Sequence, residues 1–234
     1  MSLRLPAVVC LVAWSLCAFA SAPQPAPKIR VLFEVGGTTA HEYAKQPALL
    51  KQVLEDTGRF TVTISQDRDL FRRESISRFD EVMLYTTRVE LNEEQLKGLL
   101  EFVEDGGALV GIHSSTAMCM KSDEFWRMIG GRFVKHGAGT FKVKITAKRH
   151  SICQGLSDFD ETDETYIHSF CPSSKLVVLM RREKDGEPVS WVHYYGRGRV
   201  FYTALGHDMR TWGNADFQNL VVRGSLWAAG RINP

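Results

Sequence analysis

Short runs of consecutive apolar residues alternate with helical patterns along most of this chain, and this alternation limits the fold more than any other feature. Residues 29–35, 82–86 and 108–112 are mainly apolar runs of strand length. A strand that is apolar on both sides has to be covered on both sides, as in parallel sheets with helices on each face. We therefore predict an α/β fold with a mostly parallel, doubly wound sheet.

The clearest helix is predicted over residues 92–105. Asn92 can cap its first turn, Gln95 stands where a capping box needs it, and Gly106 follows its last turn. Further helices are predicted over 47–56, 122–129 and 216–229, and further strands over 60–65, 141–145, 176–180, 189–193 and 200–205.

The amino-terminal segment has the pattern of a secretory signal peptide. An apolar stretch over 5–19 follows Arg4, and it is shorter than the roughly 20 residues of a membrane span. Ala18 and Ala20 form a small-x-small cleavage site, so we predict a signal peptide over 1–20. The alternative is an uncleaved membrane anchor. A Pro/Ala tether over 21–27 and one domain over 28–232 would follow, in a periplasmic or secreted protein without a membrane attachment.

Charge and cysteine content exclude some classes of function. The chain has 29 Lys and Arg against 27 Asp and Glu, and this near balance argues against nucleic-acid binding. Cys119, Cys153 and Cys171 follow the predicted signal peptide, so at most one disulfide could form among them, and Cys153 with Cys171 stays open. Their spacing fits no zinc motif, and buried small apolar side chains are the simplest interpretation.

Ligands of parallel α/β sheets bind at the carboxyl ends of the strands, so the residues that follow each strand are the candidate site. Histidine, whose pKa lies near neutrality, recurs there. The strand ends carry His41, Arg88, His113 with Ser114, and His207 with Asp208 and Trp212. We expect His41, His113 and His207 on one rim, within roughly a dozen ångströms of each other. They could transfer protons or hold a metal, although no H-x-H or HExxH pair is present.

Two later segments add candidates. His136 lies in a predicted loop, and Glu164 and Tyr166 follow the acidic residues 158–163. We interpret Asp158, Asp160 and Glu161 as a solvated loop. The Gly111–Ser115 turn lacks the second glycine of a hydrolase elbow, which argues against Ser114 as a nucleophile. Trp212 could stack on a sugar or pack in the core.

The motifs ALVGIHSSTA, FWRMIGGRFVKH, RHSICQGLSDFDETDETY, PVSWVHYYGRGRVFYTALGHDMRTW and SLWAAG occur in this order. Together they resemble the ThuA-like (trehalose utilisation) family from about Lys28 to Ile232, with His150-Ser151 in place of the usual His-Pro. The resemblance implies a class I glutamine amidotransferase-like, flavodoxin-like fold. It also places His113 where amidotransferases carry their nucleophilic cysteine and His207 where they carry its base. Glutaminase chemistry is therefore excluded, because Cys119 lies six residues past the elbow.

The resemblance implies an exported carbohydrate-processing enzyme that acts on a sugar or keto-sugar derivative by His/Glu acid–base chemistry. A divalent metal could assist, and lyase, isomerase and hydrolase reactions all remain candidates. The alternative is a non-catalytic carbohydrate-binding or scaffold protein. The expected catalytic residues are His41, His113, Glu164 and His207. The expected substrate-binding residues are Arg88, Ser114, His136, Tyr166, Asp208 and Trp212.

Overall fold

The computed structural model describes residues 26–38 and 41–233. The predicted signal peptide over 1–20, with its cleavage site, and most of the tether over 21–27 lie outside these described residues. Within the described part, no helix is both long enough and apolar enough to span a bilayer.

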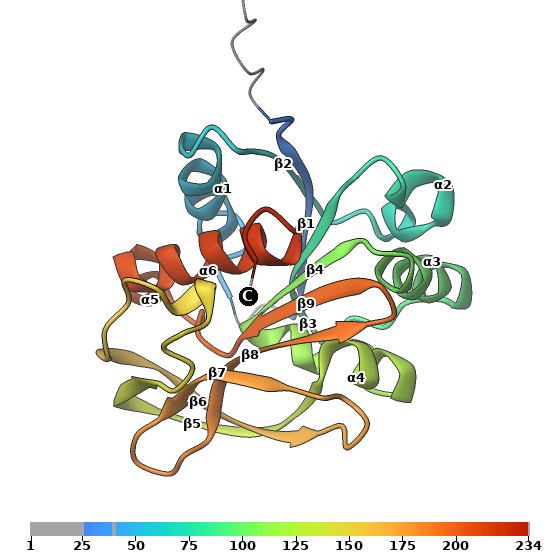
Figure 1. The fold of residues 1–234 in the computed structure, drawn as a ribbon. Coiled ribbons are helices and arrows are strands. Elements are labelled where there is room, and N and C mark those ends of the chain that lie inside the picture. Colours follow the sequence, from blue (N-terminus) through green and yellow to red (C-terminus); the bar gives the residue numbers. More distant parts are fainter. Residues whose placement is uncertain (1–25, 39–40, 234) are drawn as a thin grey trace, which may run out of the picture.

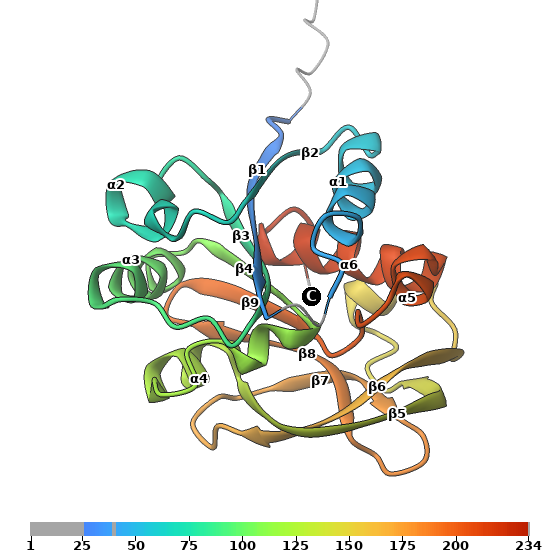
Figure 2. The ribbon, with the colours of Figure 1, turned by 180° about the vertical axis from the view of Figure 1, so that it is seen from behind.

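One sheet of nine strands runs through the protein (Figures 1 and 2). Its strands are β1 (Ile29–Gly37), β2 (Phe60–Ser65), β3 (Glu81–Thr87), β4 (Ala108–Ile112), β5 (Gly131–Ile145), β6 (Phe159–Phe170), β7 (Val177–Arg182), β8 (Pro188–Tyr195) and β9 (Gly198–Thr203). Their order is β2-β1-β3-β4-β9-β8-β7-β5-β6. The neighbours from β2 to β9 pair in parallel, and those from β9 to β6 pair antiparallel.

The prediction of a mostly parallel, doubly wound, flavodoxin-like or amidotransferase-like sheet is therefore wrong, because only the half from β2 to β9 is parallel. The physical reason lies in the connections. A parallel pair needs a crossover of a dozen or more residues, usually a helix. No α-helix interrupts the described residues 131–203, so the strands there have no helical crossover and pair antiparallel with their neighbours.

Helices cover both faces of the parallel half (Figure 1). One face carries α1 (Gln46–Asp56), α5 (Met209–Gly213) and α6 (Ala215–Ala228), and the other carries α2 (Arg73–Ile76), α3 (Glu93–Glu104) and α4 (Asp123–Ile129). Short 3₁₀ turns are η1 (Arg68–Phe71), η2 (His113–Ala117) and η3 (Ser151–Cys153). Alternate residues of β1 face the two layers: Val31 and Phe33 pack with α1 and α6, and Leu32 packs with α2 and α3.

The predicted start of α3 is confirmed in atomic detail. The Asn92 side chain accepts a hydrogen bond from the Gln95 backbone N–H at 3.0 Å, and the Gln95 side chain accepts one from the Asn92 backbone. The acidic loop expected at Asp158, Asp160 and Glu161 is wrong for the last two residues. They belong to β6, and Glu161 is only 5% exposed.

The three cysteines are free and buried, so Cys153 and Cys171 do not pair. This agrees with the prediction that Cys119, Cys153 and Cys171 act as small apolar side chains.

Candidate functional site

The candidate site lies at the carboxyl ends of the parallel strands. His41 follows β1, His113 follows β4 and His207 follows β9. Gly37, at the end of β1, has a φ of +117°, and a Cβ there would lie 2.0 Å from the Thr87 backbone oxygen. Only glycine permits this approach of β1 to β3, and it directs the following chain toward the ends of the neighbouring strands.

His41, His113 and His207, which we call the histidine cluster, meet in space as expected. One ring nitrogen from each lies within 4.8 Å of the others. The ring centroids of His41 lie 5.1 Å from those of His113 and 5.2 Å from those of His207. The residues are 72 and 94 positions apart in sequence (113 − 41 and 207 − 113), so only the sheet brings them together.

His113 is held in a strained turn and completely buried. Its backbone has a φ of 47°, in the left-handed region that few residues other than glycine adopt. Its ring Nδ1 lies 2.7 Å from the Ala204 carbonyl oxygen, and the Tyr202 hydroxyl donates to the His113 carbonyl oxygen at 2.7 Å. Gly206 packs closely against it, since a Cβ there would lie 3.3 Å from the His113 Cβ. These contacts direct the His113 Nε2 atom into the cluster.

His41 is oriented by two hydroxyl groups. Its Nδ1 lies 3.2 Å from the Tyr43 hydroxyl and 3.2 Å from the Thr87 hydroxyl. Burial, followed by the charges of His113 and His207, lowers the pKa of His41 to about 3. The imidazole of His41 is therefore neutral at physiological pH.

Glu164 joins the histidines into one site. Its carboxylate oxygens lie 3.3 Å from His113 Nε2, 3.3 Å from His207 Nδ1 and 3.2 Å from His136 Nδ1. Burial raises the pKa of Glu164, but the neighbouring imidazoles of His113, His207 and His136 lower it by more, and the net pKa lies below the ordinary value. The Glu164 side chain is 13% exposed, whereas His207 and His136 are 31% and 44% exposed. Solvent and ligands therefore reach Glu164 from the side of these two imidazoles.

The β5–β6 hairpin carries Glu164 to the histidine cluster. His136 on β5 pairs with Tyr166 on β6, and Ala138 pairs with Glu164. The ring of Tyr166 packs against His113, with ring centroids 4.3 Å apart. Tyr166 is 5% exposed, so it covers the cluster and presents little surface to a ligand.

Two residues predicted to bind substrate are buried. Ser114 has no exposed surface, so it offers no atom to a ligand at the rim. Trp212 is 1% exposed, its indole N–H donates to the Gly206 carbonyl oxygen at 2.9 Å, and its ring packs on Tyr85. Of the two interpretations of Trp212, core packing is the one that the structure supports.

Two further predicted residues lie outside the cluster. Arg88 is exposed at the end of β3, with a φ of 55°. Asp208 caps α5 by accepting the Arg210 backbone N–H at 2.8 Å, and its carboxylate also pairs with the Arg210 guanidinium. Asp208 therefore serves the local fold.

Sequence reasoning did not identify Asp163 as a positioning residue. Its carboxylate accepts hydrogen bonds from the backbone N–H groups of Gly206 at 2.7 Å and His207 at 3.0 Å, and from the Thr211 hydroxyl at 3.0 Å. Asp163 is 3% exposed and fixes the loop that carries His207. Hydropathy periodicity gave no signal for this role, because acidic residues occupy both faces of the strand, as Asp160 and Asp163 do.

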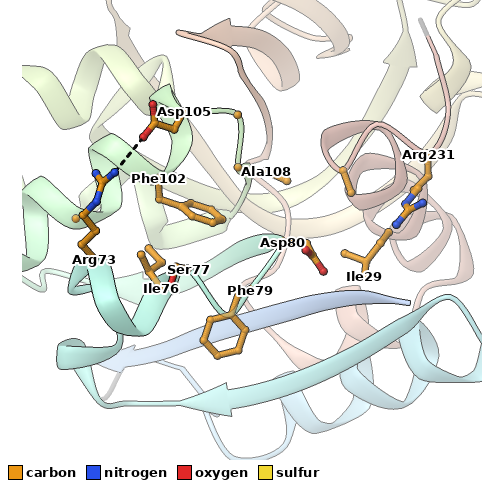
Figure 3. Close-up of a pocket in the computed structure, with 14 residues that line it drawn as sticks. Ile29, Arg73, Ile76, Ser77, Phe79, Asp80, Phe102, Asp105, Ala108 and Arg231 are labelled. Carbon is orange, nitrogen blue, oxygen red and sulfur yellow. Dashed lines mark ion pairs between the residues drawn. The ribbon is translucent and has the colours of Figure 1, made fainter. Parts of the chain in front are cut away.

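A cavity of about 460 Å³ lies at the opposite end of the sheet (Figure 3). It is lined by residues at the amino ends of the strands, such as Ile29 and Ala108, and by Asp80 and Phe102. Its lining contains no histidine or cysteine. The chemistry-bearing side chains are thus gathered at the carboxyl ends, away from this cavity.

Comparison with known proteins gives a family and a fold. A family model described as ThuA, trehalose utilisation, matches residues 30–228. No curated protein matches this sequence significantly. A ThuA-like protein from Parabacteroides merdae is 26% identical, with a TM-score of 0.75 over 86% of this chain and 90% of that chain. A ThuA-like protein from Bacteroides uniformis is 18% identical, with a TM-score of 0.74 over 90% of this chain and 95% of that chain.

More distant solved structures share the fold alone. The β-galactosidase from Bacillus circulans sp. alkalophilus is 14% identical, with a TM-score of 0.62, and the match covers 87% of this chain but 31% of that chain.

Proposed function

This chain belongs to the ThuA family, and from that premise we propose that it is an exported enzyme that processes a sugar or keto-sugar derivative by His/Glu acid–base chemistry. The family's description, trehalose utilisation, indicates a carbohydrate-related role. Export is proposed from the signal-like residues 1–20.

The observation that carries the proposal is the contact of one carboxylate with three imidazoles. The lowered pKa keeps Glu164 ionised near neutral pH, so the carboxylate is ready to accept a proton. A proton from a sugar hydroxyl, or from a carbon next to a carbonyl, would move to a Glu164 oxygen while its bonding electrons stay on the sugar. His136 lies 3.2 Å away on the exposed side and is suited to return a proton.

Nucleophilic catalysis by cysteine does not fit this site. Cys119 is 2% exposed, and burial raises the pKa of its thiol to about 12. The reactive form of cysteine is the thiolate, which is scarce at that pKa. The proposed reaction is therefore proton transfer to and from a neutral, hydroxyl-rich substrate. The histidine cluster adjoins Glu164 through His113 and His207.

Replacement of the base tests this proposal. We expect Glu164→Gln to lower kcat on the sugar substrate by about 100-fold or more, because a positioned acid or base contributes about 10²–10⁴-fold. Trehalose, related disaccharides and their keto derivatives would be incubated with the purified protein, and products followed by NMR. Glu74→Gln is the matched control, because Glu74 is exposed on α2 and should leave turnover unchanged.

Equal turnover by Glu164→Gln and Glu74→Gln would refute the role of Glu164. Measurable sugar binding without turnover of any of these compounds would instead support a carbohydrate-binding protein.

A further inference from the structure

We propose that His41, His113 and His207 together bind one divalent transition-metal ion. The ring atoms His41 Nε2, His113 Nε2 and His207 Nδ1 are buried without a hydrogen-bond partner among the described residues. They are also the side chains whose ring nitrogens lie within 4.8 Å of one another. Leaving a buried polar atom unpaired costs about 1–3 kcal/mol, so three such atoms at one point require a common partner.

The hydrogen bonds on the far sides of the rings assign the protons. Nδ1 of His113 lies 2.7 Å from a carbonyl oxygen, which can only accept, so this nitrogen carries the proton. At His41, the Tyr43 hydroxyl donates its single proton to Thr87 and leaves its oxygen to accept from Nδ1, while the Thr87 hydroxyl lies at the same 3.2 Å from Nδ1. The His113 imidazole therefore directs the lone pair of Nε2 into the cluster, and the His41 imidazole does so in the tautomer that donates to Tyr43. Metal-bound histidines are oriented by the same kind of bond from the other ring nitrogen.

The surroundings of these lone pairs call for a positive charge. His113 Nε2 and His207 Nδ1 each lie 3.3 Å from a Glu164 oxygen, so the lone pair of His113 faces an acceptor atom. His113 has no exposed side-chain surface, so bulk water does not separate these groups. A cation among the three nitrogens would satisfy the lone pairs and balance the carboxylate.

The donor set selects the kind of cation. Imidazole nitrogen suits Zn²⁺, Co²⁺, Ni²⁺, Cu²⁺ and Fe²⁺, whereas Mg²⁺ and Ca²⁺ take oxygen ligands. Two nitrogens at 2.0–2.1 Å from a tetrahedral ion lie about 3.3 Å apart. Because the cluster spans up to 4.8 Å, binding requires the rings to move together.

Three protein ligands leave a coordination position open, as in catalytic metal sites. Glu164 borders two of the three ligand atoms, so the open position would face its carboxylate. This consequence rests on the proposed function: a sugar hydroxyl or carbonyl oxygen would occupy the open position while Glu164 accepts the proton. Binding of the ion itself does not depend on that reaction.

Metal titration of the purified full chain tests the site without a sugar. After chelator treatment and dialysis, Zn²⁺ binding would be followed by calorimetry and Co²⁺ binding by visible absorption. We expect one ion per chain. His41→Ala and His207→Ala should each weaken binding by about a hundredfold or more, because even the outer partners of metal ligands contribute about 10–100-fold.

His136→Ala is the matched control, because His136 also contacts Glu164 but lies outside the cluster. It should retain one Zn²⁺ ion, and so should Glu164→Gln. Since His113→Ala could unfold the strained turn, His113→Asn, checked by circular dichroism, provides the third ligand variant.

Absence of Zn²⁺ and Co²⁺ binding, or equal binding by folded cluster variants and His136→Ala, would overturn the proposal. Sugar turnover by a protein that binds neither metal would overturn it while leaving the proposed function intact, and metal binding without turnover would do the reverse.

Discussion

His113 shows how much of the site depends on a single backbone conformation. A residue in a sparsely populated region of φ and ψ costs about 1–3 kcal/mol and persists only where its surroundings hold it. Here the Ala204 carbonyl oxygen and the Tyr202 hydroxyl hold it from two sides. The sequence suggested a ligand-facing residue at this turn, and the structure places its ring beside those of His41 and His207. It did not suggest complete burial, because the covering residue, Tyr166, belongs to a strand that was not predicted.

Two substitutions at this position separate the loss of the ring from the backbone strain. We expect His113→Ala to lower the free energy of unfolding by about 2–4 kcal/mol, through the lost packing and the unpaired Ala204 carbonyl oxygen. His113→Gly should be less destabilising than His113→Ala by about 1 kcal/mol, because glycine adopts a φ of 47° without the penalty of other residues. Urea denaturation of both variants measures the difference. A glycine variant less stable than the alanine variant would show that the turn is not strained.

The β5–β6 hairpin is the element that completes the site, and it is also the element that sequence reasoning described least well. The segment 159–170 begins FDETDETY, and its acidic side chains, which stand on both faces, concealed a strand. The Glu161 and Asp163 side chains point inward, where both accept hydrogen bonds from the Thr211 hydroxyl of α5. Asp163 also accepts one from the His207 backbone N–H in the loop before α5. Periodicity alone does not reveal such partners, which come from another part of the chain.

The hydrogen bonds between this hairpin and the His207 loop can be tested by substitution of Asp163. Hydrogen bonds to a charged group contribute about 1.5–3 kcal/mol each, and Asp163→Asn leaves one acceptor oxygen in place of two. We expect a loss of about 3 kcal/mol in the free energy of unfolding, together with lower kcat, since His207 loses its anchor. Asp160→Asn on the same strand is the control, because Asp160 is 65% exposed and, within the described part of the chain, forms an ion pair only with Lys142 at the surface. Similar stabilities for the two variants, measured by chemical denaturation, would show that the Asp163 hydrogen bonds do not stabilise the fold.

For the whole molecule, the sequence predicted the parallel half well and the antiparallel half poorly. An apolar run such as 189–193 or 200–205 has the same sequence pattern in a parallel strand and in an antiparallel strand. Strand direction is set by the connection, and the decisive fact was the lack of α-helices between residues 131 and 203. The helices that were predicted, including α3 and α6, lie where their apolar faces cover the sheet.

The buried sheet also makes the stability of the molecule depend on pH. Glu81 on β3 has no exposed surface, and burial raises its pKa to about 8 from 4.5, despite a hydrogen bond from Ser225. Between these values the folded protein keeps a proton that the unfolded chain releases, so this group makes stability fall as pH rises from about 4.5 to about 8. One proton corresponds to about 1.4 kcal/mol per pH unit.

We therefore expect Glu81→Gln to be more stable than the parent protein at pH 8, with the gap shrinking steadily toward pH 5. Urea denaturation across this range measures the gap. Other groups, such as Glu34 with its pKa raised to about 7 by burial, titrate in both proteins and cancel in the difference. Parallel stability profiles of the two proteins would show that Glu81 does not titrate in this way.

The place of β9 in the sheet determines when during folding the site can form. β9 (Gly198–Thr203) is the last strand of the chain, yet it lies between β4 and β8 in the middle of the sheet. Until it inserts, the chain has two smaller sheets with open edges, which are prone to pair with other chains. His207 follows directly, 166 positions after His41 (207 − 41). A ribosome must therefore deliver almost the entire domain before the histidine cluster is complete, and a chain that stops short of β9 has open edges and an incomplete site.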